Sequence, residues 1–519
     1  MGSYLFPLLA PAALLLAAGA AFRRPGRRPG AIPILAEAAA MFAVLVTLAA
    51  LVVWVRQGPV TSLLIGLKGI GLAVRIDGLS AIMMVLVAFV GWLVVRYART
   101  YLDGDSAQGR FTGWLCAALA MVLMLVQAGN LLLLATAWIG VGICLHRLLL
   151  FYPERPGARR AARKKSASAR LGDTALLLAL GMLVFAYGTG DIAAIGAAAR
   201  AGEGHPAVFI TALMLAFAAI VKSAQFPLHG WLTEVMETPT PVSALLHAGI
   251  VNAGGFLLIR FADVMLLAPG VLAVLVMVGG FTAIFASLVM LTQSAVKTSL
   301  AWSTIAQMGF MIMQCGLALF PLALLHIVAH SLYKAHAFLA SGSTVEAVAA
   351  TRRPGPIAIP GARSVVLAFV AALAIYATTG FAFGFSDKSP QAIAIGAILV
   401  FGVAYLLAQG LADDAPRLLT RRTALYSVAA SVAYFLLHGA SAWLMTDTLP
   451  ATPPPGRLEW ALIVLVVVSF GAVAVAQALF PLWAYHPAAV GLRVHIANGL
   501  YINALTDRIL RGWTTRHSA

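Results

Sequence analysis

Long apolar runs recur from one end of this chain to the other, and they leave few folds open to it. A helix needs about 20 apolar residues to cross a bilayer, and we count about 13 to 14 runs of that kind. Closed barrels also span membranes, but their strands alternate apolar and polar residues, whereas these runs are continuous. Only 10% of the residues are charged, far below the roughly 25% of a soluble domain. The sequence therefore predicts an all-α polytopic membrane protein.

The polar segments between these runs are short. The longest, Pro153 to Arg170 and Thr446 to Glu459, are too short to build the core of a soluble domain. The tail "VGLRVHIANGLYINALTDRILRGW" mixes apolar and basic residues at helical spacing. This pattern predicts an amphipathic helix on the membrane surface or against a partner.

The net charge of +17 includes two basic clusters. One follows the first apolar run at Arg23 to Arg28, and the other fills the linker that ends at Arg170. Both fall on one side of the membrane if the N-terminus is outside and about five spans precede residue 170, in agreement with the positive-inside rule. The charge therefore indicates topology rather than nucleic-acid binding, with the basic loops in the cytoplasm. These loops are either simply solvated or bind an acidic partner or lipid headgroups.

The stretch "VKSAQFPLHGWLTEVMETPTPVSALLHAGIV", from Val221 to Val251, is polar for a membrane segment. Lys222 ends an apolar run, and the following residues are typical of a helix interrupted at Pro227, which frees backbone groups that must face protein or water. An ionisable residue in a span is costly and is therefore a functional candidate, with snorkelling to the interface as the alternative. Desolvation at such a break would let Lys222 release a proton at modest cost.

A second helix is expected to begin after the two glutamates of this stretch, Glu234 and Glu237, which we place near the mouth of a hydrated channel. Pro239 and Pro241 occupy the first turn of that helix, where they cost no internal hydrogen bonds. His247 follows on the same helix. A lone buried histidine is usually only hydrogen-bonded, so its polar neighbours are what make His247 a candidate for ion translocation.

His326, His330 and Lys334, in "HIVAHSLYKAHAFLASGS", are spaced by four residues and share one face of a predicted span. Two histidines at this spacing can bind zinc, but lysine is a poor ligand and no nearby carboxylate or thiol completes a site. The three cysteines lack paired spacing, so we expect neither a disulfide nor a metal site. A proton relay is the better interpretation, because imidazoles titrate near neutral pH and pass protons through ordered water.

Asp387 and Lys388 divide a further apolar segment, "TTGFAFGFSDKSPQAI". Glycines and Pro390 flank them, which indicates a second discontinuous helix. A short loop between two complete spans would give the same pattern, so both interpretations stay open. Lys297 lies close to the start of another span and is better explained as an anchor at a helix end.

Three strings, "KSAQFPLHGWLTEVMETPTPVSALLHAGIV", "VKTSLAWSTIAQMGFM" and "HSLYKAHAFLASGS", resemble the core of the proton-translocating antiporter-like subunits. This family includes the large membrane subunit of respiratory NADH:quinone oxidoreductase and the Mrp cation/proton antiporters. The resemblance covers most of the chain and is strongest from Lys222 to Ser343. It implies two inverted five-helix repeats, each with a broken helix, in residues 111–265 and 266–445. N-terminal helices in 1–110 would precede them, and a last span with the amphipathic helix would follow in 446–519.

Carried over by motif, the resemblance implies a polar axis for ion translocation formed by Lys222, His247, His326, His330, Lys334 and Lys388. The match at Lys388 is weaker, because the family reads Ser-Lys-Asp where this chain reads Ser-Asp-Lys. Ile139, directly after Trp138, stands where the family has the glutamate that pairs with the first lysine. Glu37, Asp387 or a carboxylate of a partner protein are candidate replacements.

The phrases "WIGVGICLHRLLLFYPERP" and "LHAGIVNAGGFLLIRF" look most similar to DabB, the membrane subunits of DAB inorganic carbon transporters. The short tail agrees, since it leaves no room for the long lateral helix and final anchor of the respiratory subunit. The resemblance implies a subunit of the bacterial inner (cytoplasmic) membrane that conducts protons or another cation. This flow would drive hydration of CO2 to bicarbonate on DabA, a soluble zinc protein resembling β-carbonic anhydrases.

On this interpretation the chain itself is no enzyme and has no cofactor, because zinc and catalysis are expected on the partner. Three alternatives stay open. The chain could be a proton-pumping subunit of an NADH:quinone oxidoreductase-like complex, a subunit of a Mrp-type cation/proton antiporter, or a membrane scaffold that conducts nothing. The costly line of His326, His330 and Lys334 argues against a scaffold, because such residues have little packing value.

Overall fold

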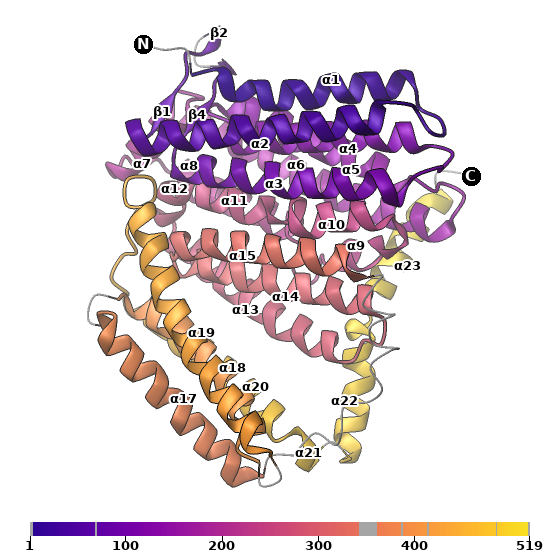
Figure 1. Cartoon of the computed structure of the whole chain (residues 1–519). Coiled ribbons are helices and arrows are strands. Elements are labelled where there is room, and N and C mark those ends of the chain that lie inside the picture. The colour runs from indigo at the N-terminus through magenta and orange to yellow at the C-terminus, as the bar shows by residue number, and fades with distance from the viewer. Residues whose placement is uncertain are drawn as a thin grey trace.

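The computed structural model describes residues 4–67, 70–341, 361–385, 388–412, 415–483 and 485–516. Helices dominate it and stack in a broad bundle (Figure 1). The described residues contain 13 helical segments long and apolar enough to cross a membrane. The chain is a multi-pass membrane protein, and the predicted number of spans is confirmed.

The helices differ in length, and several short ones lie between the spans. The first part of the chain forms α1 (Leu9–Arg23), α2 (Ile32–Gln57), α3 (Gly78–Tyr101), α4 (Gln108–Val126), α5 (Leu131–Leu149), α6 (Pro156–Tyr187), α7 (Ile192–Arg200), α8 (Ala207–Lys222), α9 (Gly230–Thr233), α10 (Thr240–Ala248), α11 (Ala253–Arg260) and α12 (Ala262–Leu266). The second part forms α13 (Pro269–Leu291), α14 (Val296–Gly316), α15 (Phe320–Leu339), α17 (Ala362–Ala382), α18 (Pro390–Gly410), α19 (Arg417–Leu444), α20 (Arg457–Ala478), α21 (Phe480–Trp483), α22 (Pro487–Ala497) and α23 (Ile502–Arg516). The main apolar core extends through α1 to α15, and two smaller clusters involve α17 to α20.

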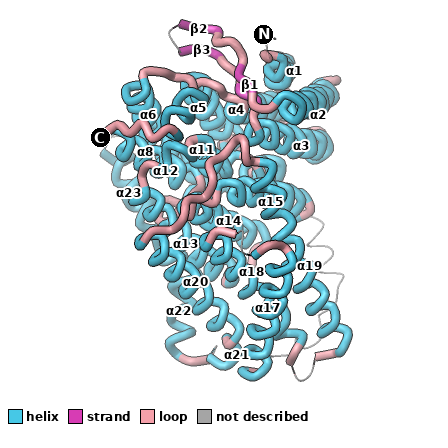
Figure 2. Tube along the Cα trace, turned by 90° about the vertical axis from the view of Figure 1, so that its left-hand side faces the viewer, coloured by secondary structure: helices cyan, strands magenta, loops and turns pink. Residues whose placement is uncertain are grey.

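One departure from the all-α prediction lies between α2 and α3. Two short antiparallel pairs form there, β1 (Val60–Thr61) with β4 (Arg75–Ile76) and β2 (Ile65–Leu67) with β3 (Ile70–Leu72). Glycines recur among the apolar residues of this segment. They lower its helix propensity and let the backbones of paired strands approach closely. A Cβ at Gly71 would overlap the backbone of Ile65. Figure 2 shows the β2–β3 hairpin projecting from the bundle.

The structure corrects the extent of the basic linker. Residues 156–170, expected as a loop, form the first half of α6, a helix of 32 residues. Pro156 lies in its first turn, and the alanines, arginines and lysines that follow are good helix formers. Lys164 and Lys165 of this half are buried. The polarity that predicts a loop therefore belongs to a helix that packs against protein.

Two helices flank the segment that we interpreted as a second broken helix. α17 and α18 are 21 residues each, and both are long and apolar enough to span a membrane. They pack against each other and are joined by residues 383–389, of which 386 and 387 lie outside the described residues. Ser389 caps the new helix and Pro390 lies in its first turn. A short connection between complete spans therefore fits the described residues, as the alternative interpretation expected.

The C-terminal tail folds back along the bundle. α22 packs against α13 and α23 against α9, and Figure 1 shows this yellow segment beside the ends of the helices of the central bundle. The predicted amphipathic segment is thus helical, and it lies against helices of its own chain.

Candidate functional site

The first polar site begins where α8 ends at Lys222. Several residues of turn follow before α9, and they contain Pro227, which is preceded by a cis peptide bond. Pro239 is the N-cap of α10 and Pro241 lies in its first turn. The chain therefore leaves one helix at Lys222 and begins the next at the two prolines.

Lys222 faces the aromatic ring of Trp138 on α5, with its Nζ atom 4.3 Å from the ring centroid. The same indole donates its Nε1–H to Asp173 Oδ1 of α6 at 2.8 Å. A cavity of about 20 Å³ is lined by Lys222, Trp138 and Asp173, together with Lys165. This volume holds about one water molecule. Lys222 and Asp173 thus line one cavity the size of a single water molecule.

Asp173 is a functional candidate that is absent from the sequence-based prediction. It is an ionisable residue inside a predicted span, and this signal could have identified it. Ile139 instead packs against the apolar core. Glu37 pairs with arginines of α3, so it is not the substitute, and Asp387 lies outside the described residues. The carboxylate beside Trp138 comes from α6 rather than from α5.

A second cavity lies next to the first. It measures about 30 Å³ and is lined by Asn252 and Ser331 among mostly apolar side chains. Asn252 Nδ2 donates to Ser331 Oγ at 2.8 Å, which joins the segment between α10 and α11 to α15. Ile250 lines both cavities. Ile250 thus borders both the Lys222 cavity and the cavity beside Ser331 of α15.

Two buried histidines lie close to this second cavity. His247 of α10 is fully buried, and its ring stacks on Phe338 of α15 with centroids 4.4 Å apart. His330 of α15 is also buried. Among the described residues, neither ring nitrogen of either histidine has a protein hydrogen-bond partner. Buried polar groups normally have hydrogen-bond partners, so internal water molecules are the expected partners of these imidazoles.

The rest of the predicted line follows along α15. His326 lies one turn before His330, with ring centroids 6.2 Å apart. Buried Lys334 donates to Ser303 Oγ at 2.8 Å and to Leu300 O at 3.2 Å, both on α14. The structure therefore brings all three predicted residues of α15 to one interior face. In the part of the chain that the structure describes, no group of three or more His, Cys, Asp or Glu could hold a metal ion.

The remaining predicted residues contact other elements. Lys388 lies in the connection between α17 and α18. Its Nζ atom is close to Gly439 of α19, because a Cβ atom added to that glycine would lie 4.0 Å from it. Lys297 Nζ donates to Thr240 Oγ1 at 3.2 Å, near the starts of α14 and α10, as suits a residue at a helix end. Glu237 belongs to the turn Val235–Glu237, and its side chain lies outside the described residues.

Glu234, which we expect near a channel mouth, belongs to a polar cluster with α6. Buried Lys164 of α6 contacts Glu234 and lies 3.0 Å from Asp507 of α23. Asn503 Nδ2 of the tail donates to Thr233 Oγ1 at 3.1 Å. The tail therefore binds the segment that directly follows the break at Lys222.

Gly230→Ala should loosen this attachment. A Cβ at Gly230 would overlap Asn503 Oδ1, so the Asn503 side chain must turn away and lose its hydrogen bond to Thr233 of α9, which helps to hold the tail. We expect trypsin to cleave after Arg508 several-fold faster in this variant, as measured by limited proteolysis. The double variant Gly230→Ala/Asn503→Ala removes the clash and should regain part of the protection. Equal cleavage of the native chain and Gly230→Ala would show that this contact does not hold the tail.

Comparisons with known proteins agree with this architecture. The family model described as NADH:quinone oxidoreductase/Mrp antiporter, TM matches residues 128–355. The model for the N-terminus of chain 5 of NADH-ubiquinone oxidoreductase (complex I) matches residues 65–112. The "Probable inorganic carbon transporter subunit DabB2" of Halothiobacillus neapolitanus is 38% identical over 470 residues, which is 87% of this chain and 82% of that protein. This chain belongs to the DabB family of inorganic carbon transporter subunits.

Other relatives match over a smaller part of their length. The "Probable inorganic carbon transporter subunit DabB" of Hydrogenovibrio crunogenus is 46% identical over 275 residues, 53% of each chain. NADH-quinone oxidoreductase subunit L of Escherichia coli is 38% identical over 284 residues, 54% of this chain and 46% of that protein. The chain thus spans about half the length of these two. The solved structure of the Mrp complex from Dietzia sp. matches 98% of this DabB-family chain and 60% of its own, with a TM-score of 0.63 and 21% identity, which shows a shared fold.

Proposed function

We propose that this DabB-family chain conducts protons along the buried polar line and that this flow drives inorganic carbon uptake by a soluble partner. The observation that carries the proposal is the line itself. Polar groups follow one another from the cavity of Lys222 and Asp173, past Ile250, to Asn252 and Ser331. Buried His330 and Lys334 continue it along α15. Such groups are costly in a membrane protein and repay their cost when they carry ions.

Each residue of the first site has a distinct task in this proposal. Lys222 holds the mobile proton, and the electron-rich face of Trp138 stabilises its charged form. The carboxylate of Asp173, oriented by the indole N–H, attracts that proton through a bridging water. Ile250 limits passage to moments when water links the two cavities. His330 and then Lys334 receive the proton, because an imidazole both accepts and donates one.

Asp173→Asn is expected to reduce proton flux at least tenfold. The amide keeps the hydrogen bond from Trp138 but removes the negative charge that attracts the proton of Lys222. Flux is measured as quenching of a pH-sensitive dye in vesicles that contain the assembled transporter. Asp105→Asn is a matched control, since Asp105 accepts a hydrogen bond from Tyr152 in a segment remote from this line. Native flux in Asp173→Asn would remove Asp173 from the pathway.

The proposed setting is the bacterial inner membrane, with the N-terminus outside and the basic half of α6 at the cytoplasmic end. The positive-inside rule supports this orientation. We also propose that residues 111–265 and 266–445 are two inverted repeats, one built around Lys222 and the other around Lys334.

The proposed partner is a DabA-like soluble zinc protein resembling β-carbonic anhydrases, which would carry out the hydration of CO2. The test is to purify this chain from its native membrane in mild detergent and to identify the bound proteins by mass spectrometry. One large soluble zinc protein is the expected result, followed by bicarbonate uptake that requires both subunits. Copurification with quinone oxidoreductase or Mrp subunits would overturn the proposal in favour of the respiratory or antiporter alternatives.

A further inference from the structure

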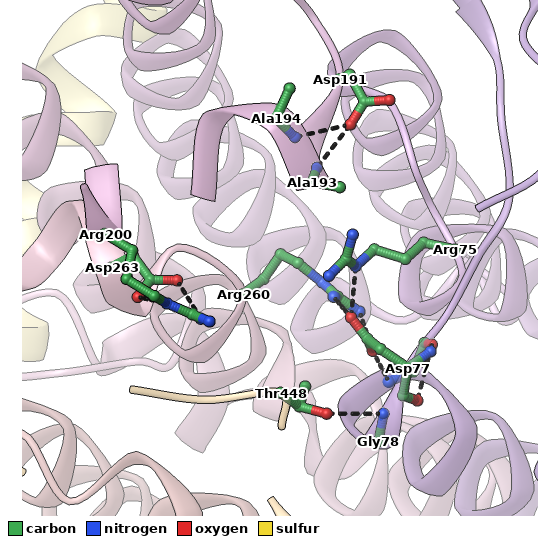
Figure 3. Close-up of polar contacts among 11 residues, drawn as sticks. Arg75, Asp77, Gly78, Asp191, Ala193, Ala194, Arg200, Arg260, Asp263 and Thr448 are labelled. Carbon is green, nitrogen blue, oxygen red and sulfur yellow. Dashed lines mark hydrogen bonds and ion pairs between the residues drawn. The ribbon is translucent and has the colours of Figure 1, made fainter. Parts of the chain in front are cut away.

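A second charged cluster lies at the far end of α11 from Asn252, apart from the proposed proton line. Asp77, the fully buried N-cap of α3, accepts hydrogen bonds from Arg260 at the end of α11 and from Arg75 of β4, the latter at 2.6 Å. Figure 3 shows both guanidinium groups converging on this carboxylate. Arg200 of α7 pairs separately with Asp263 of α12 at 3.0 Å (Figure 3).

These residues line a polar cavity of about 160 Å³. This volume holds several water molecules or one small ion with water. Its charged groups are three arginines and three aspartates, Arg75, Arg200, Arg260, Asp77, Asp263 and Asp447. The pair of Arg200 and Asp263 is neutral, and Asp447 is exposed, where water screens its charge. The buried end of the cavity therefore holds the guanidinium groups of Arg75 and Arg260 and only the carboxylate of Asp77. This leaves an excess of one positive charge.

Arg260 also has an unused donor. Its side chain is only 4% exposed. Both terminal nitrogens bind Asp77, but Nε has no hydrogen-bond partner among the described residues and is buried. A buried N–H of a charged group without an acceptor is costly. We propose that this cavity binds a small, planar, monovalent oxyanion through Arg260 Nε and the guanidinium of Arg75.

Guanidinium groups suit this class of ligand because they are flat, permanently charged and present parallel N–H donors to two oxygens at once. Chloride offers a single centre and cannot use such a pair of donors. Bicarbonate is the planar oxyanion that a carbon transporter meets, and this choice alone rests on the proposed function. The site would let the membrane subunit respond to bicarbonate at a place separate from the proton line.

Binding is tested on the purified full chain in detergent, by thermal unfolding in sodium bicarbonate, sodium nitrate or sodium chloride at pH 8 and constant ionic strength. Nitrate serves as a planar monovalent oxyanion of similar shape. We expect bicarbonate and nitrate to raise Tm in a saturable manner and chloride to do so much less. An equal response to all three salts, or none, would overturn the proposed site.

Arg75→Gln locates the effect. Asp77 keeps its bonds to Arg260 in this variant, so the fold should survive, and the half-saturating bicarbonate concentration should rise at least about tenfold, which corresponds to the loss of one charge-assisted contact. Arg75→Lys keeps the charge but loses the paired donors and should recover only part of the binding. Arg56→Gln, an exposed arginine at the end of α2, should bind as the native chain does. Unchanged binding in Arg75→Gln would contradict the site. Because no transport is measured, the outcome is independent of whether proton flow drives carbon uptake.

Discussion

Lys222→Ala is expected to reduce proton flux and carbon uptake to background while the chain still folds and assembles. The substitution removes the ammonium group that holds the proton beside Trp138 and Asp173. The methyl group of the new alanine cannot carry a proton. Folding should survive, because the truncation also removes the cost of keeping an ammonium group away from water. Flux is measured in vesicles that contain the assembled transporter, and assembly is measured by copurification of the partner.

Lys297→Ala is the matched control for this loss. Lys297 is another lysine near a helix start, and its ammonium group donates to Thr240 at a helix end. We expect near-native flux from this variant. If Lys222→Ala also retained native flux, Lys222 would be a packing residue and the proposed line would have to begin elsewhere.

The second large effect is on stability. Asp77→Asn should lower the free energy of unfolding by about 3–5 kcal/mol, because removal of one partner leaves the guanidinium of Arg260 buried without its counter-charge. Asparagine is as good an N-cap as aspartate, so the change reports the ion pairs rather than the cap. Asp191→Asn is the control. Asp191 caps α7 by accepting from Ala193 and Ala194, and its replacement should change stability by less than about 0.5 kcal/mol.

The pH dependence of this effect has a definite sign. Burial alone would raise the pKa of Asp77, but the charges of Arg260 and Arg75 outweigh it and hold the pKa well below its usual range. A carboxyl group with a lowered pKa stabilises the fold at every pH above its ordinary value of about 3.9, and this contribution is lost as pH falls toward the lowered value. The difference in Tm between the native chain and Asp77→Asn should therefore be constant from pH 8 to about 5. It should shrink only in stronger acid. A difference that already halves near pH 6 would show that Asp77 is not held ionised by its arginines.

Sequence patterns predicted the parts of this site that depend on local spacing. His326, His330 and Lys334 share a face because the helix repeat is 3.6 residues, and the break after Lys222 follows from Pro227. Asp173 could have been singled out as an ionisable residue inside a predicted span, but its contact with Trp138 on another helix depends on how α5 and α6 pack and could not be predicted. The helical structure of the basic half of α6 was not predicted for a related reason. Its lysines are buried by tertiary contacts, which polarity along the chain does not reveal.

The attachment of the tail has a consequence for the order of folding during synthesis. Lys164 is buried between Glu234 and the tail, and its contact with the backbone of Asn503 joins residues 339 positions apart. Membrane helices emerge from the ribosome in sequence, with N-terminal segments free to fold first. The first half of the bundle can thus insert early, but Lys164 gains its partners in α23 only after that helix has been made. A chain whose synthesis has not yet reached α23 would expose the segment beside Lys222, and α23 would cover it on arrival.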